Sequence, residues 1–253
     1  MGLTCSIEDK VNELVFQPPQ LDPTNIKMDN IIFITYNNNT VPILHLKPII
    51  GNKYIIWSHG NASNIHTMEP YLLELHNHLK VGIIAYDYQG YGLSNGQVSE
   101  SNCYHDLEAT VNFVLNQLGI KQSDITLIGQ SLGTGVVIDY LAKHDWFSPA
   151  ILISPYKSIS RVVTEPSSIS CISYLADPLD KFKSCTKITK VKCPIRIIHG
   201  TQDTLIDISH AKYLYDQLPD KSLTPIWIKR AGHNDILNKI KLRHIKEVII
   251  KSY

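Results

Sequence analysis

Short hydrophobic runs alternate with longer amphipathic stretches along most of the chain. The runs are rich in Ile and Val and are bounded by Gly, Pro, Asn or Asp, which is typical of buried strands. The amphipathic stretches carry apolar residues at helical spacing, which predicts helices packed on those strands. Strands are predicted at 54–57, 81–86, 125–128, 150–153, 194–198 and 224–229, and helices at 67–80, at 101–118, from 132, at 209–218 and from 235.

This alternation predicts an α/β fold whose mostly parallel sheet is covered by helices on both faces. No repeat or composition break divides residues 31–253, which we interpret as one domain that opens with a hairpin, its strands at 31–36 and 41–47. Residues 155–193 lack clear periodicity, and we interpret them as a short lid over the carboxyl ends of the strands. Residues 1–30 contain three prolines and are predicted to form an irregular arm.

The composition limits the possible partners and compartment. The net charge of +1 and the pI of about 7.7 do not favour nucleic-acid binding. No apolar run approaches the roughly 18 residues of a membrane span, and charged residues interrupt the N-terminus before a signal-peptide core can form. The five cysteines lack metal-ligand spacing and are interpreted as free thiols of a reducing compartment. A cytoplasmic monomer without a metal or organic cofactor is predicted.

The N-terminus, M-G-L-T-C-S, matches the pattern for N-myristoylation at Gly2. Cys5 follows closely and is a candidate for palmitoylation. A single myristoyl chain binds membranes only marginally, so both lipids would be needed for a stable anchor on the cytosolic face of a membrane. The pattern fixes few positions, and a chance match is the alternative.

Ser131 lies in Gly129-Gln130-Ser131-Leu132-Gly133, between a predicted strand and a predicted helix. The pattern G-x-S-x-G in this setting is typical of a nucleophile elbow, a sharp turn that exposes a serine hydroxyl. A Cβ at Gly129 or Gly133 would collide with the strand or the helix, which explains the two glycines. Ser131 is therefore the candidate nucleophile. The alternative is a turn serine that caps its helix.

A serine hydroxyl needs a base, and the base needs a third group to orient it. Asp203 follows the predicted strand 194–198, and His233 follows the last predicted strand. Both are therefore expected at the same sheet edge as Ser131, in the chain order Ser, Asp, His that one large class of serine hydrolases uses. Asp207 competes with Asp203 but is also placed to cap the next helix. For His233 the alternative is a surface-loop histidine.

The loop after the first buried strand contains His59-Gly60-Asn61. A loop in this place commonly supplies one backbone N–H to an oxyanion hole, and the residue after the nucleophile supplies the other. Asn61 and Leu132 are therefore the candidate donors. His59 belongs to this loop and is interpreted as structural, not as a second base.

Five motifs occur in order along the chain, at residues 58–62, 86–96, 129–134, 199–203 and 231–235. Together they resemble the α/β-hydrolase domain-containing protein 17 family, whose members are membrane-anchored serine hydrolases that remove palmitate from cysteine thioesters of other proteins. The resemblance implies the α/β-hydrolase fold, with Ser131 as nucleophile, Asp203 as acid and His233 as base. The family has a palmitoylated cysteine cluster near its N-terminus, where this chain has only Cys5.

The sequence thus predicts a serine hydrolase that cleaves fatty acyl thioesters, above all S-palmitoyl groups on proteins, through an acyl-enzyme. A monoacylglycerol-type lipase or a small-ester esterase would share the triad and differ in the lid. A hydrolase-fold scaffold without turnover is the third hypothesis. Residues 157–192 carry seven basic and three acidic residues, so this side of the molecule either is solvated or faces an anionic membrane surface.

Overall fold

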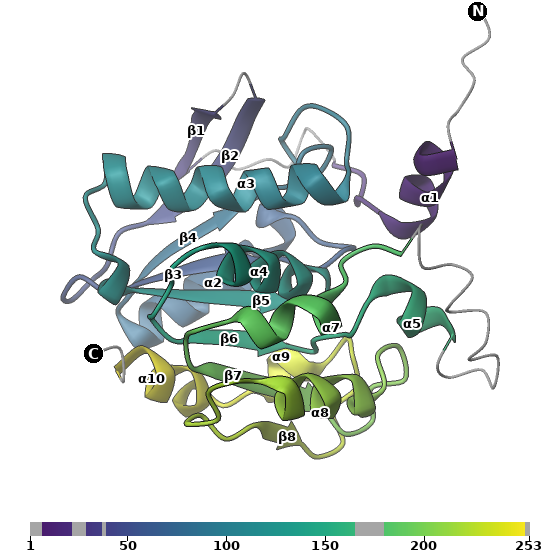
Figure 1. Ribbon diagram of the computed structural model, residues 1–253. Coiled ribbons are helices and arrows are strands. Elements are labelled where there is room, and N and C mark those ends of the chain that lie inside the picture. The colour runs from purple at the N-terminus through teal and green to yellow at the C-terminus, as the bar shows by residue number, and fades with distance from the viewer. Residues whose placement is uncertain (1–6, 22–28, 37–38, 165–179, 251–253) are drawn as a thin grey trace, which may run out of the picture.

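The computed structural model describes residues 7–21, 29–36, 39–164 and 180–250. Their strands form a single sheet in the order β1-β2-β4-β3-β5-β6-β7-β8, with helices on both faces (Figure 1). The first two pairings, β1 with β2 and β2 with β4, are antiparallel, and all the others are parallel, which confirms the predicted α/β architecture. The strands are β1 Ile31–Tyr36, β2 Asn39–Leu46, β3 Tyr54–Ser58, β4 Gly82–Tyr86, β5 Ile125–Gln130, β6 Ala150–Ile153, β7 Ile195–Gly200 and β8 Ile226–Ile228.

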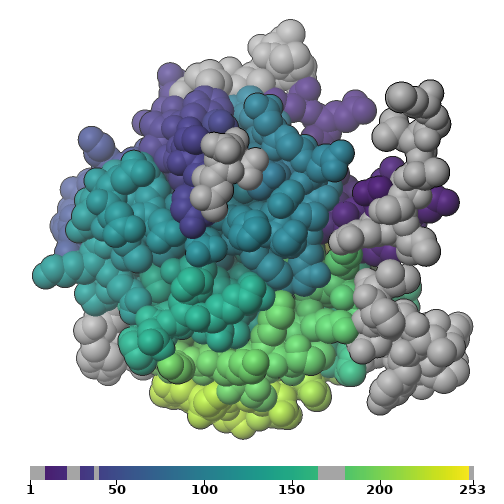
Figure 2. Space-filling model, turned by 45° about the horizontal axis from the view of Figure 1, so that its top comes forward, coloured from purple at the N-terminus to yellow at the C-terminus, as the bar shows by residue number. Residues whose placement is uncertain are grey.

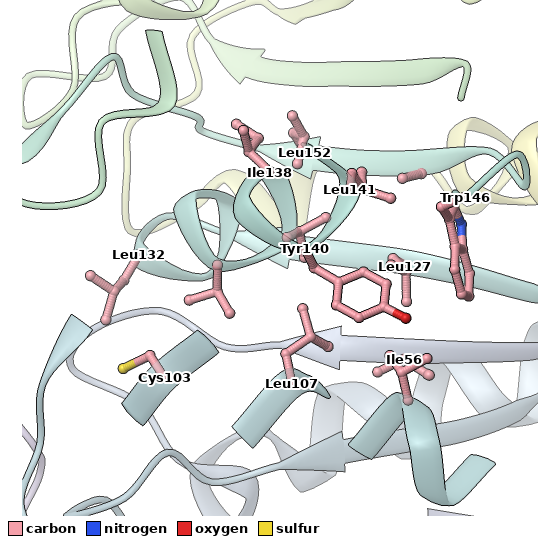
Figure 3. Close-up of a cluster of buried hydrophobic side chains, with 14 of the residues drawn as sticks. Ile56, Cys103, Leu107, Leu127, Leu132, Ile138, Tyr140, Leu141, Trp146 and Leu152 are labelled. Atoms are coloured by element: carbon pink, nitrogen blue, oxygen red, sulfur yellow. The ribbon is translucent and has the colours of Figure 1, made fainter. Parts of the chain in front are cut away.

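The central strands are buried on both faces, so their sequences are continuous hydrophobic runs. Successive side chains point to opposite faces: Ile56 and Leu127 pack into one half of the core, and Ile55 and Ile128 pack into the other. In the first half, side chains from two helices close over the strands, as Figure 3 shows for Leu107 and Leu141.

The helices divide between the two faces of the sheet. α3, α4 and α8 contribute buried side chains to the half of the core shown in Figure 3, and α2 and α10 cover the other. The helices are α1 Ile7–Val15, α2 Ile65–Leu79, α3 Glu100–Asn112, α4 Leu132–Lys143, α5 Ile159–Thr164, α7 Ser184–Lys187, α8 Ile208–Gln217, α9 Ile236–Lys239 and α10 Leu242–Ile250. α3 continues as a π-helical turn over Phe113–Gln117, and Gly119, at φ 67°, follows its end.

The prediction of an irregular arm at residues 1–30 is wrong over Ile7–Val15, which form α1. The prolines lie beyond the end of this helix and restrict only the chain near them. Val11 and Val15 stand one helical turn apart and are partly buried, and Phe16, the next residue, is buried. An apolar stripe that contacts the domain therefore stabilises a helix in the arm.

Two other predicted segments differ in extent. The C-terminal helix is divided into α9 and α10, because the backbone is extended at Ile240, with ψ at 124°. The ends of the predicted lid at 155–193 form α5 and α7. Its centre, residues 165–179, lies outside the described residues, so the lid stays a prediction. Residues 37–38, between the two strands of the predicted hairpin, lie outside them too. No helix in the described part of the chain is long and apolar enough to span a membrane.

Candidate active site

Ser131 lies between the end of β5 and the start of α4, as the sequence predicts. Its φ of 49° and ψ of −117° are a sparsely populated combination for a residue with a side chain. The turn is held by a hydrogen bond from the Ser131 N–H to the carbonyl oxygen of Ile153 on the neighbouring strand β6, at 2.9 Å. The strained turn therefore presents Ser131 at the carboxyl edge of the sheet.

Close backbone approach explains the two glycines around Ser131. A Cβ on Gly129 would lie 2.5 Å from the carbonyl oxygen of Gly133. A Cβ on Gly133 would lie 2.2 Å from the carbonyl oxygen of Ser58, at the end of β3. Real Cβ atoms do not approach this closely, so both positions require glycine, for the reason that the sequence analysis gave.

Ser131, His233 and Asp203 lie in one chain of hydrogen bonds. The Ser131 Oγ lies 3.0 Å from the His233 Nε2, and the His233 Nδ1 lies 2.8 Å from the Asp203 Oδ2. With the Asp203 carboxyl ionised, Nδ1 must carry the proton and donate it, which leaves Nε2 as the acceptor for the Ser131 hydroxyl. The three residues come from loops at the ends of β5, β7 and β8, which the fold brings to one edge.

Asp203 is held as an anion. Burial of its side chain opposes ionisation, but the hydrogen bond and charge of His233 and the N–H of Ile206 together place the pKa of Asp203 below its ordinary value. Its Oδ1 accepts from the backbone N–H groups of Leu205, at 3.0 Å, and Ile206, at 2.8 Å. These two bonds fix the carboxylate so that Oδ2 remains directed at His233.

Asp207, the alternative acid, has another role. Its Oδ1 accepts from the backbone N–H of Ser209 at 2.9 Å and caps the N-terminus of α8. The carboxylate that contacts His233 is therefore that of Asp203.

His199 is a neighbour of this site that the sequence analysis did not single out. Its Nε2 lies 2.9 Å from the carbonyl oxygen of Ile206, to which it donates, and 3.5 Å from the Asp203 Oδ2. Burial lowers the pKa of His199, although the nearby carboxylate opposes that change. The motif at 199–203 contains this histidine, but its spacing alone does not reveal that the side chain turns back under the Asp203 loop.

The predicted oxyanion loop packs directly against the elbow. A Cβ on Gly60 would lie 3.5 Å from the Cβ of Ser131. Asn61, the next residue, and Leu132, the first residue of α4, flank this contact. Their backbone N–H groups stay the predicted oxyanion donors.

His59 is structural, as predicted. It is 1% exposed, and its ring lies against Tyr88, with ring centroids 4.3 Å apart. Its Nδ1 donates to the carbonyl oxygen of Gly60 at 2.8 Å, so Nε2 is an acceptor, 3.6 Å from the Asp87 Oδ1. Burial lowers the pKa of His59 to about 4 and raises the pKa of Asp87 to about 7.

Burial of Asp87 predicts that the free energy of unfolding depends on pH. The pKa of Asp87 rises from 3.8 to about 7 on folding, so the folded protein binds more protons between these values, and the free energy of unfolding falls as pH rises through this window. The stability advantage of wild type over Asp87→Asn is therefore expected to be larger at pH 5 than at pH 8, as measured by urea unfolding. An advantage that grows with pH would contradict the assignment. Asp106, whose pKa burial also raises to about 7, is present in both proteins, so the two differ only in the Asp87 charge and in its repulsion of Asp106.

The part of the chain that the structure describes contains no group of three or more His, Cys, Asp or Glu side chains that could hold a metal ion. Cys103, Cys185 and Cys193 are free thiols, and Cys5 and Cys171 lie outside the described residues. Gly2 lies outside them too, so the lipidation of Gly2 and Cys5 stays a prediction.

Several known proteins are similar to this chain in sequence. The family model described as Serine aminopeptidase, S33 matches residues 52–179. The putative alpha/beta hydrolase L404 of Acanthamoeba polyphaga mimivirus is 44% identical, over 98% of this chain and 95% of that protein. Human alpha/beta hydrolase domain-containing protein 17B is 33% identical, over 80% of this chain and 68% of its own length. The 17C protein of Xenopus tropicalis is 37% identical, over 74% of this chain and 58% of its own length.

Solved structures agree on the fold. The esterase Pf2001 of Pyrococcus furiosus matches with a TM-score of 0.74 and 18% identity, over 93% of this chain and 99% of that one. Alpha/beta hydrolase domain-containing protein 10 from mouse matches with a TM-score of 0.66 and 16% identity, over 88% and 99%. The fold, the ordered motifs and the homologues agree: the chain belongs to the α/β-hydrolase family, among the relatives of α/β-hydrolase domain-containing protein 17.

Proposed function

We propose that this protein is a serine hydrolase that cleaves fatty acyl thioesters, with S-palmitoyl groups on proteins as its principal substrates. The observation that carries the proposal is the hydrogen-bonded chain from the Asp203 carboxylate through His233 to the Ser131 hydroxyl. A nucleophile, a base and an orienting acid in this order are the parts that acyl transfer needs. The motifs shared with the domain-containing protein 17 family support the thioester as substrate.

The proposed reaction has two halves, acylation of Ser131 and hydrolysis of the acyl-enzyme, and the same groups act in both. The Ser131 Oγ attacks the thioester carbonyl carbon while the His233 Nε2 takes the hydroxyl proton, and Asp203 stabilises the imidazolium. The N–H groups of Asn61 and Leu132 stabilise the oxyanion. The intermediate collapses with loss of the cysteine thiolate, which receives the proton from His233. Water, deprotonated by His233, then attacks the carbonyl carbon of the acyl-enzyme. The bond from this carbon to the Ser131 Oγ breaks, the proton on His233 returns to that oxygen, and the fatty acid is released.

The same site suits an oxygen ester, so a monoacylglycerol-type lipase or a small-ester esterase is the second candidate. The two differ in what the lid admits, not in the triad. A scaffold without turnover is disfavoured, because the three side chains keep the geometry that catalysis needs. The protein is proposed to act on its acylated substrate at a membrane surface as a monomer. Lys187, one of the seven basic residues of 157–192, pairs with Asp139 at 2.7 Å, so its charge is balanced within the protein.

Parallel assays with a palmitoyl-cysteine peptide and a monoacylglycerol test the proposal. We expect turnover of the thioester, measured as release of free thiol, to exceed turnover of the glyceride. Glyceride turnover alone would retain the triad and transfer the function to the lipase alternative. Lack of turnover of either substrate, together with no labelling by a fluorophosphonate probe, would leave the scaffold hypothesis.

A further inference from the structure

The side chain of Asn61 is held by residues far from it in sequence. Its Nδ2 donates to the carbonyl oxygen of Val15 at 2.8 Å, and its Oδ1 accepts from the N–H of Gln17 at 3.0 Å. The carbonyl can only accept and the N–H can only donate, so the amide orientation is unambiguous. Tyr91 donates its hydroxyl to the same Oδ1 at 2.5 Å. The residue that we assign to the oxyanion hole is thus tied to the end of α1.

The chain beyond α1 is itself anchored. Phe16 is 3% exposed, and its ring meets that of Phe182 edge to face, with centroids 5.9 Å apart. In Figure 1 this part of the arm lies beside the green segment that leads into α7, and Figure 2 shows purple and green atoms together at this rim. Phe182 in turn packs on α4, the elbow helix that begins after Ser131. A Cβ built on Gly135 of this helix would lie 3.0 Å from the Cβ of Phe182. The arm therefore connects the elbow helix with the oxyanion loop.

Other contacts hold the preceding residues of the loop from within the domain. Tyr88 donates its hydroxyl to the carbonyl oxygen of His59 at 2.8 Å, and the His59 ring bonds the carbonyl oxygen of Gly60. Of the three hydrogen bonds that the Asn61 side chain makes within the described residues, the arm supplies two. Oxyanion donors work only within a narrow range of positions, and a misplacement of about 1 Å is enough to lower a rate by about 10²-fold.

We infer that residues 15–17 form a positioning element of the active site. Phe16 anchors the arm, and the backbone of Val15 and Gln17 then fixes Asn61 so that its N–H faces the oxyanion. The catalytic part of this inference rests on the proposed function. The arm acts through Asn61 and does not touch the reacting atoms, and the rate of acyl transfer depends on whether the arm is docked.

Phe16→Ala in the full-length protein tests this inference, with Leu14→Ala as the matched control, because Leu14 lies two residues away, in the last turn of α1, and is 79% exposed. We expect Phe16→Ala to lower kcat by roughly 10-fold or more at an unchanged KM, since the loss concerns the transition state. Amide hydrogen exchange in a peptide covering residues 59–64 is expected to rise in Phe16→Ala and to stay at the wild-type level in Leu14→Ala. Phe16→Leu, which keeps a buried apolar side chain, is expected to restore most of kcat.

Asn61→Asp is the second variant, and it applies if Phe16→Ala does not fold. It replaces the amide donor that faces the Val15 carbonyl oxygen with a carboxylate acceptor. Loss of this hydrogen bond is expected to raise the amide hydrogen exchange of residues 10–17 in the arm. Unchanged exchange in both segments, whatever the effect on kcat, overturns the inference. Hydrogen exchange is measured without substrate, so it tests the coupling of arm and loop independently of turnover. If the wild-type protein shows no turnover, the proposed function is refuted, and the exchange data still test the coupling.

Discussion

Ser131→Ala is expected to lower kcat for thioester and ester substrates by about 10⁴-fold or more. The substitution removes the atom proposed to form the acyl-enzyme, while the rest of the hydrogen-bonded chain, from His233 to Asp203, remains in place. Substrate binding needs no bond to the serine, so KM is expected to change little. Steady-state kinetics measure both constants, and a fluorophosphonate probe is expected to label the wild type and not the variant.

Ser154→Ala is the matched control for this experiment. Ser154 also follows a parallel strand and also has a positive φ, 53°, and its Oγ is buried without a hydrogen-bond partner in the described residues. Loss of this hydroxyl is therefore expected to leave kcat and probe labelling near the wild-type values. Residual labelling of Ser131→Ala, or loss of labelling in Ser154→Ala, would contradict the assignment of the nucleophile.

The parts of the site that can be predicted from the sequence are those that depend on a short motif or on the position of a residue directly after a strand. The elbow needs glycine at positions 129 and 133 because a Cβ there would collide with backbone atoms of Gly133 and Ser58. This requirement can be recognised in the five consecutive residues 129–133. The position of Asp203 and His233 beside Ser131 can be predicted because parallel strands bring all their carboxyl ends to one edge, so that position along the chain predicts position in space. The fold was predictable for the same reason, because buried strands are continuous apolar runs.

The parts that sequence missed depend on contacts between distant residues. Nothing in the arm's sequence indicates that backbone groups at Val15 and Gln17 bond the Asn61 side chain, because backbone groups leave no residue signature. The sequence does not predict α1, because the three prolines that follow it are typical of irregular chain. It does not indicate a role for His199 either, because the Asp203 loop must fold back over this side chain before the two approach each other.

Asp203→Asn is expected to lower kcat by about 10⁴-fold. An asparagine amide directed at His233 offers a donor where the carboxylate offered an acceptor, so the imidazole adopts the tautomer whose Nε2 carries the proton and cannot accept from Ser131. If the amide instead presents its oxygen, the tautomer is retained but the charge that stabilises the imidazolium is lost. The loss should therefore fall on kcat and should not be recovered at any pH at which the protein is folded.

Asp207→Asn separates this effect from a general loss of charge in the same loop. Asn is as good a helix N-cap as Asp, so the bond to the Ser209 N–H can be kept, and stability is expected to change by less than about 1 kcal/mol. Because Asp207 caps α8 and does not bond His233, its variant is expected to retain nearly full kcat. Thermal unfolding of both variants checks that each is folded. A large loss of kcat in Asp207→Asn, with Asp203→Asn still active, would show that the acid of the triad is Asp207 and that the hydrogen bond from His233 to Asp203 is not the catalytic one.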